Sequence, residues 1–127
     1  MLSGILFGSE AWYGVTKQQI QLLETADLHY FKKLFGAHCH TAKEAFYLET
    51  GKLPIKFLIM KRRLMYWRHI INSNSDGLLL KFYKIQKACP VRNDWVSQIE
   101  MDKTEINLQL TDEEVIGLSK WKFKKLL

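Results

Sequence analysis

The sequence predicts an all-α protein, a compact bundle of six to seven helices around a long central helix that is both apolar and basic. Three observations favour this fold class. Apolar residues recur three and four positions apart in several segments, which is the period of one helix face. Three segments begin with a Thr followed three residues later by Gln or Glu, the capping-box pattern of a helix start. No segment alternates apolar and polar residues well enough to predict a strand.

The composition suits one domain with a hydrophobic core, because 47% of the 127 residues are hydrophobic and 13% are aromatic. We therefore expect a single helical domain over residues 1–127. No uncharged apolar run is long enough to span a membrane. The two cysteines are too few for a disulfide framework, and no basic segment precedes the apolar start. These features favour an intracellular protein, nuclear or cytoplasmic.

Residues 1–15 give few local signals. An apolar side is present, but three glycines each cost a helix about 1 kcal/mol relative to alanine. We expect this segment to be the truncated edge of something longer, with apolar side chains that require a partner outside the chain. Such an exposed patch favours association, so a monomer and a dimer both stay open. The apolar residues in question are Leu2, Ile5, Leu6 and Trp12.

The first clear helix begins at the capping box of Thr16 and Gln19 and ends near Gly36, which suits the left-handed position after a helix. A second box, Thr41 with Glu44, opens a short helix that closes at Gly51. The first helix is expected to bury one face, made of Ile20, Leu23, Ala26 or Asp27, Tyr30, Phe31 and Leu34.

The central helix is expected over residues 51–72, with Pro54 in its first turn, where the missing N–H costs nothing. One apolar stripe alternates three and four residues apart and must face a core. Its members are Phe57, Met60, Leu64, Trp67 and Ile71. The same segment carries cations at three positions around the helix, so they cannot all face one partner.

The remaining chain reads as short helices. Residues 78–88 form an amphipathic helix stopped by Pro90, Asp94 caps a helix to about residue 105, and the box of Thr111 and Glu114 opens another through residue 118. Residues 119–127 suit a second phosphate contact or a short nuclear-localisation-like basic run, but we expect them to be a frayed basic tail, the end of a longer helix. The inward face predicted for residues 78–88 is Leu79, Phe82, Tyr83 and Ile85 or Gln86, with Lys81, Lys84 and Lys87 outward.

The net charge of +6 is unevenly distributed. Residues 51–90 carry nine basic and one acidic residue, whereas residues 91–118 carry two basic and seven acidic residues. The last nine residues carry four lysines and no acid. A concentrated basic block is typical of a phosphate-binding surface, although part of it can equally pair with the acidic segment.

Three stretches together resemble the region after the reverse transcriptase palm in LINE-type, non-long-terminal-repeat retrotransposons. They are GSEAWYGVTKQQIQLLETADLHYFKKLFGAH, TAKEAFYLETGKLPIKFLIMKRRLMYWRHIIN and KFYKIQKACPVRNDWVSQI, and they cover nearly the whole chain. The most specific part runs from Glu44 to Arg63. The resemblance implies a thumb and connector, the helical part that lies against template and primer beside the palm.

The chain departs from that family where the chemistry is performed. It has no Asp-Asp pair to hold two metal ions for nucleotide addition, and no downstream cysteine cluster. We therefore expect no polymerase activity, and instead a non-catalytic fragment that binds RNA or an RNA–DNA hybrid through phosphates. The candidate phosphate ligands are Lys52, Lys56, Lys61, Arg62, Arg63 and Arg68. Ion pairs to Glu44, Glu49 or the acidic segment are expected to occupy two or three of them.

The aromatic residues are expected mainly in the core, with Trp67 the safest member. Tyr47, Tyr66 and Trp121 are the candidates for stacking on bases. The run His38-Cys39-His40 contains good zinc ligands, but adjacent residues seldom point at one ion and a structural site requires four ligands. We therefore expect no metal and no cofactor.

Three rival interpretations stay open at this stage. The first is a protein-interaction module that docks through residues 1–15, originally onto its own palm. The second is a helix-turn-helix DNA-binding domain, although the single Arg-Arg pair offers little to read base edges. The third is a fragment without function.

Overall fold

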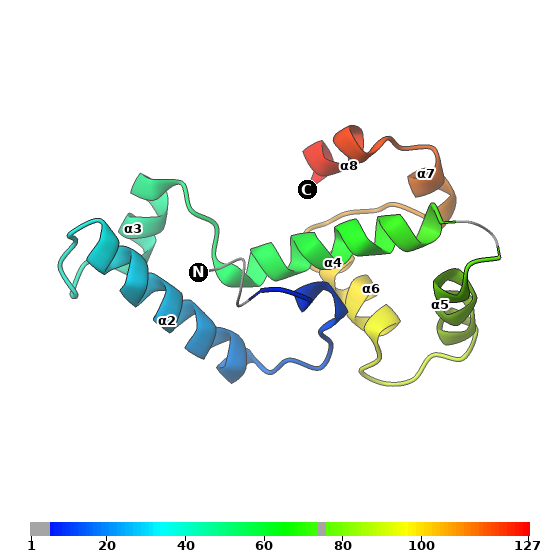
Figure 1. Ribbon diagram of the computed structural model, residues 1–127, viewed down its shortest axis with the longest axis horizontal. Coiled ribbons are helices and arrows are strands. Elements are labelled where there is room, and N and C mark those ends of the chain that lie inside the picture. The colour runs from blue at the N-terminus through cyan, green and yellow to red at the C-terminus, as the bar shows by residue number, and fades with distance from the viewer. Residues whose placement is uncertain (1–5, 74–75) are drawn as a thin grey trace. The chain divides into compact units, whose positions relative to one another are not determined.

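The computed structural model describes residues 6–73 and 76–127, and these residues form seven α-helices and one short 3₁₀ helix (Figure 1). No strand occurs in these two ranges, so the predicted all-α class and the number of helices are confirmed. None of the described helices is long and apolar enough to cross a membrane. The elements are η1 (Ser9–Ala11), α2 (Lys17–Leu34), α3 (Lys43–Thr50), α4 (Ile55–Ile71), α5 (Leu78–Ala88), α6 (Trp95–Glu105), α7 (Asp112–Ile116) and α8 (Lys120–Leu126).

The described residues group into two units. Leu6, Phe7 and Val15–Ile59 belong to unit 1, whereas Gly8–Gly14 and Met60–Leu127 belong to unit 2. Helix α4 begins in unit 1, and its residues from Met60 onward belong to unit 2. With 17 residues it is one residue shorter than α2, so its role as the long central helix stays a prediction.

In unit 1, local signals set the ends of α2. The Thr16 hydroxyl accepts from the Gln19 N–H, and the Gln19 side chain accepts from the Thr16 N–H, which confirms the capping box. Gly36 has a φ of 65°, and the N–H groups of Gly36 and Ala37 donate to the carbonyls of Lys33 and Lys32. This is the bond pattern of a Schellman motif, in which a left-handed glycine ends the helix.

The cap predicted for α3 is wrong. Its N-cap is Ala42, with no side-chain hydrogen bond, so Thr41 and Glu44 do not form a capping box. The predicted stop at Gly51 is confirmed, since this residue has a φ of 64°. Rings connect α3 to α2, because Phe46 is buried and its ring centroid lies 6.3 Å from that of Phe35.

Unit 2 has a hydrophobic core drawn from five helices. Trp67, Ile99, Val115 and Phe123 are fully buried in it, and Trp67 is thus confirmed as a core residue. Met60, Leu64, Trp67 and Ile71 of the predicted stripe are buried, but Phe57 is 41% exposed. The core members are Leu64, Trp67, Ile70, Ile71, Leu80, Tyr83, Val96, Ile99, Val115 and Phe123.

Two predicted inward faces are partly wrong. In α5 the buried residues are Leu80 and Tyr83, whereas Leu79, Phe82 and Ile85 are about half exposed. The helix is therefore turned so that its lysines and several apolar side chains face solvent. In α2 the buried position is Asp27, and the predicted Tyr30 and Leu34 are exposed.

The C-terminal segment is not a frayed tail. Ser119 caps α8 by accepting from the Lys122 N–H at 3.3 Å, and Phe123 is fully buried with its ring centroid 6.2 Å from that of Trp67. This aromatic contact anchors α8 on the core of unit 2 and so defines the side of the helix from which its lysines extend.

The N-terminal edge differs from the expectation in its described part. Leu6 is buried and Trp12 is half-buried, whereas Phe7 and Tyr13 are the exposed large apolar residues. Leu2 and Ile5 lie outside the described residues.

Candidate nucleic-acid interface

The clearest cationic surface lies on α8. Of the seven described residues of this helix, Phe123 is the buried one. Its insertion against Trp67 fixes the rotation of α8 about its own axis, so the remaining side chains point outward. The exposed lysines are Lys120, Lys122, Lys124 and Lys125.

Helix α4 carries further cations of unit 2, and one of them contacts the residue before the α8 cap. Arg68 donates from Nη2 to the carbonyl of Leu118 at 3.0 Å, directly before the α8 cap. Arg62 is exposed and Lys61 is half-buried on the same helix. The contact of Arg68 therefore joins the basic end of α4 to the start of α8.

Arg63 is not a surface cation, which corrects its assignment to the phosphate ligands. It is 4% exposed, pairs through Nη1 with the Asp102 carboxylate and donates from Nε to the Trp12 carbonyl at 3.1 Å. The pairing with an acid of residues 91–118 is the alternative that the charge pattern left open. Burial requires such a partner, because an unpaired charge in a core is strongly unfavourable.

Lys52 is also held within the fold. Its ammonium pairs with the buried Asp27 and lies 3.4 Å from the ring centroid of Phe31, all within unit 1. Lys56 is half-buried, with Nζ 5.9 Å from the Phe57 centroid. The six predicted cations are thus divided: Lys52 and Lys56 belong to unit 1, and the other four belong to unit 2.

The three stacking candidates differ in exposure. Trp121 is 65% exposed, with Lys125 Nζ 3.9 Å from its ring centroid. Tyr66 is half-buried and packs edge-on against Trp95 at 6.0 Å. Tyr47 is half-buried as well, and burial raises the pKa of its phenol. Trp121 is therefore the candidate with the most open ring.

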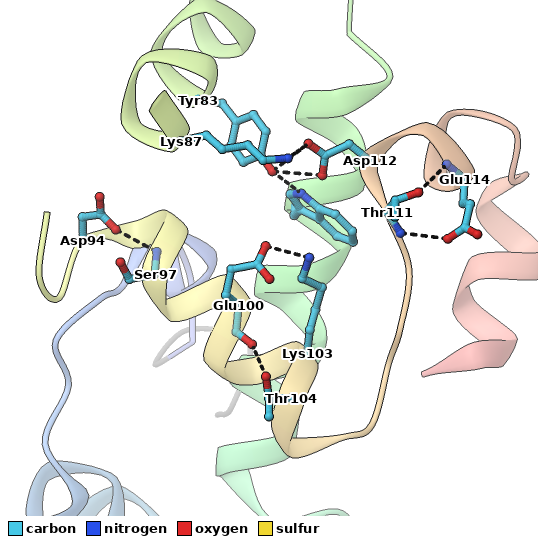
Figure 2. A network of polar contacts seen from close by, with 11 residues as sticks. Tyr83, Lys87, Asp94, Ser97, Glu100, Lys103, Thr104, Thr111, Asp112 and Glu114 are labelled. Carbon is cyan, nitrogen blue, oxygen red and sulfur yellow. Dashed lines mark hydrogen bonds and ion pairs between the residues drawn. The ribbon is translucent and has the colours of Figure 1, made fainter. Parts of the chain in front are cut away.

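A polar network supports the core beneath α8 (Figure 2). Tyr83 accepts from the Trp67 indole N–H at 3.0 Å and donates its hydroxyl to Asp112, which also pairs with Lys87. Burial raises the pKa of Tyr83, so its hydroxyl remains a donor. The network ties α4, α5 and α7 together around Trp67, the residue on which α8 rests.

Lys103 lies over the ring of the same tryptophan and pairs with Glu100, as the dashed line in Figure 2 shows. Its Nζ lies 2.7 Å from Glu100 and 4.7 Å from the Trp67 ring centroid. Lys103 is 8% exposed, so this cation stabilises the core and is not part of the basic surface.

The α8 lysines are not among the six predicted ligands, because the sequence favours a frayed end for this segment over a second phosphate contact. The signal that identifies them is the placement of Phe123 among four lysines, which predicts an amphipathic helix with one apolar anchor.

The unit 1 loop holds the potential metal ligands His38, Cys39 and His40, whose ligand atoms lie within 4.8 Å of one another.

No protein-family model, curated protein or solved structure matches this chain.

Proposed function

We propose that this chain binds RNA or an RNA–DNA hybrid through phosphate contacts, without a catalytic role of its own. The observation that carries the proposal is the orientation of α8. Phe123 is buried against Trp67, and the four lysines of the helix are exposed. Arg62 and Lys61 of α4 extend this set within unit 2.

The physical basis is the release of counterions from the phosphate backbone when lysines neutralise it. A helix of seven residues is about 10 Å long, which is the span of a few phosphates. Such contacts set position and affinity without reading sequence. Trp121 adds an exposed ring beside the lysines, and an aromatic ring of this kind suits an unpaired base.

The resemblance to the thumb and connector of LINE-type reverse transcriptases is part of the same proposal. In that family this region lies against template and primer, which is consistent with a basic surface that does not read bases. The phosphate contacts thus come from α8 and from Lys61 and Arg62 of α4, whereas Arg63 and Lys52 are structural residues.

The test is the binding of the full chain to a labelled RNA–DNA hybrid, measured by fluorescence anisotropy at low and high salt. Lys120→Glu/Lys124→Glu should weaken binding strongly. The matched control is Lys81→Glu/Lys84→Glu, which reverses two exposed lysines on α5 and should have a smaller effect. Equal losses in both variants, or a folded protein that does not bind, would exclude α8 as the binding surface.

A second candidate function is a protein-interaction module. Unit 2 has an apolar hollow of about 190 Å³ beside α5, lined in part by Tyr13, Tyr66, Phe82 and Trp95. Salt separates the two candidates, because phosphate binding falls steeply with ionic strength and apolar docking does not.

A further inference from the structure

The loop between α2 and α3 brings three metal-binding side chains together. The ligand atoms of His38, Cys39 and His40 lie within 4.8 Å of one another, and all three residues are exposed. We propose that this cluster binds a soft or borderline transition-metal ion, Zn²⁺ or Cu⁺, through one thiolate and two imidazoles. The site lies in unit 1 and does not depend on the proposed nucleic-acid interface of unit 2.

A turn in the backbone is what allows adjacent residues to converge. The Thr41 N–H donates to the His38 carbonyl at 3.0 Å, which closes a turn around Cys39 and His40. The two imidazole centroids are 5.2 Å apart, and the Cys39 Sγ lies 3.9 Å from the His38 Nδ1. That nitrogen accepts from the His40 N–H at 3.2 Å, which leaves Nε2 as the His38 atom available to an ion. Zinc bonds of about 2.0–2.3 Å in tetrahedral geometry place two ligand atoms about 3.5 Å apart, so small side-chain rotations complete the geometry.

The loop is fixed to α2 on both sides of His40. Lys32 donates from Nζ to the carbonyl of Cys39 at 3.1 Å and to that of Thr41 at 2.6 Å. The Schellman motif at Gly36 fixes the point where the loop leaves the helix. A loop held in this way loses less conformational entropy when an ion binds.

The donor set selects the ion. The cluster has no carboxylate, so it does not suit Mg²⁺ or Ca²⁺, whereas thiolate and imidazole suit Zn²⁺ and Cu⁺. Bound Cu⁺ is neutralised by one thiolate, but bound Zn²⁺ leaves a positive charge close to Lys32 and so favours an anionic fourth ligand. A hollow of about 250 Å³ beside Cys39, lined in part by His29 and Lys33, has room for that ligand.

The experiment uses the full chain, reduced with a thiol-free reagent. Co²⁺ serves as the spectroscopic substitute for Zn²⁺, and thiolate-to-cobalt charge-transfer absorption followed by displacement with Zn²⁺ reports the site. Cu⁺ is tested separately by competition with a chromophoric Cu⁺ chelator. We expect one ion per chain. Comparison of the Zn²⁺ and Cu⁺ affinities from the two measurements shows which ion the site prefers.

Matched variants decide whether the cluster is the site. Cys39→Ser removes a direct ligand, and loss of a hydrogen-bond partner behind a ligand already weakens metal binding about 10–100-fold, so we expect a loss of affinity no smaller than that. Cys89→Ser, at the other exposed thiol, should leave binding unchanged. His40→Ala should weaken binding, whereas His69→Ala, at an exposed histidine of unit 2, should not. Circular dichroism checks that each variant keeps its helices. Binding that survives Cys39→Ser, falls equally with Cys89→Ser, or exceeds one ion per chain would overturn the proposal.

Discussion

Arg63 and Asp102 form a buried ion pair that joins α4 to α6. The two residues are 4% and 2% exposed, and Gln98 Nε2 also donates to the Asp102 carboxylate at 3.3 Å. Because the guanidinium donates to the Trp12 carbonyl as well, this one side chain joins three segments of unit 2. Arg63 thus stabilises the fold, and a variant at this position is unsuitable for testing nucleic-acid binding.

Arg63→Ala should lower the free energy of unfolding by about 3–5 kcal/mol, because it leaves the Asp102 carboxylate buried without its cation. Urea unfolding measures the loss. Arg62→Ala, at the exposed neighbouring residue, should cost no more than about 1 kcal/mol. A similar loss in both variants would contradict a structural role specific to Arg63.

Two threonines of unit 1 should respond differently to replacement by alanine. Thr16→Ala removes the hydroxyl that accepts from the Gln19 N–H, and should cost about 0.5–2 kcal/mol. Thr41→Ala should be nearly neutral, since α3 has no side-chain cap. The Thr41 atom that accepts from Lys32 is the backbone carbonyl, which the variant keeps. Urea unfolding of both variants tests this difference, and equal losses would show that Thr41 does cap α3.

The same pair of threonines shows what the sequence can predict. Helix ends set by contacts within four residues, such as the boxes at Thr16 and Thr111 and the stop at Gly36, follow from local patterns. Burial does not, because it depends on partners far along the chain. Arg63 is buried by an aspartate 39 positions away, and α5 turns Leu80 inward and leaves Phe82 outside. For the α8 lysines, the sequence allows a phosphate contact but favours a frayed end, and the distant contact of Phe123 with Trp67 is what orders the helix.

Tyr83 should make the protein less stable at alkaline pH. Burial raises its folded-state pKa above the ordinary value of 10.0. Its contribution to stability is therefore complete below that pH and falls as the pH rises above it, because the unfolded state loses the proton first. Urea unfolding at about pH 8 and about pH 11 should show this fall.

The control for Tyr83 is a phenylalanine variant. Tyr83→Phe should cost about 1–3 kcal/mol at neutral pH, since the Trp67 N–H loses its acceptor, but its stability should fall less at high pH. Tyr30→Phe, at an exposed tyrosine of unit 1, should keep the wild-type pH dependence. An identical alkaline loss in Tyr83→Phe would contradict the assignment.

Trp121 and Phe123 should separate binding from folding within one helix. Phe123→Ala empties a fully buried position and should cost about 3–5 kcal/mol of stability. Trp121→Ala, at a side chain 65% exposed, should change stability by no more than about 0.5 kcal/mol. It should instead weaken binding to a hybrid with a single-stranded overhang by about 1–3 kcal/mol, the value of one base stacked on an aromatic ring. Unchanged affinity for the overhang would exclude stacking on Trp121.

The salt dependence of binding should give the number of phosphates that α8 contacts. The slope of log K against log salt changes by about 0.9 for each phosphate contact on a duplex and about 0.7 on a single strand. If Lys120 and Lys124 each contact one phosphate, Lys120→Gln/Lys124→Gln should reduce the slope by about 1.4–1.8, measured by anisotropy over a salt series. Lys81→Gln/Lys84→Gln on α5 removes the same charge from a different helix, and should reduce affinity slightly without changing the slope as much. Direct contact with phosphates distinguishes the two helices, whereas a long-range electrostatic field does not. Equal slope changes would therefore mean that the lysines act through net charge alone.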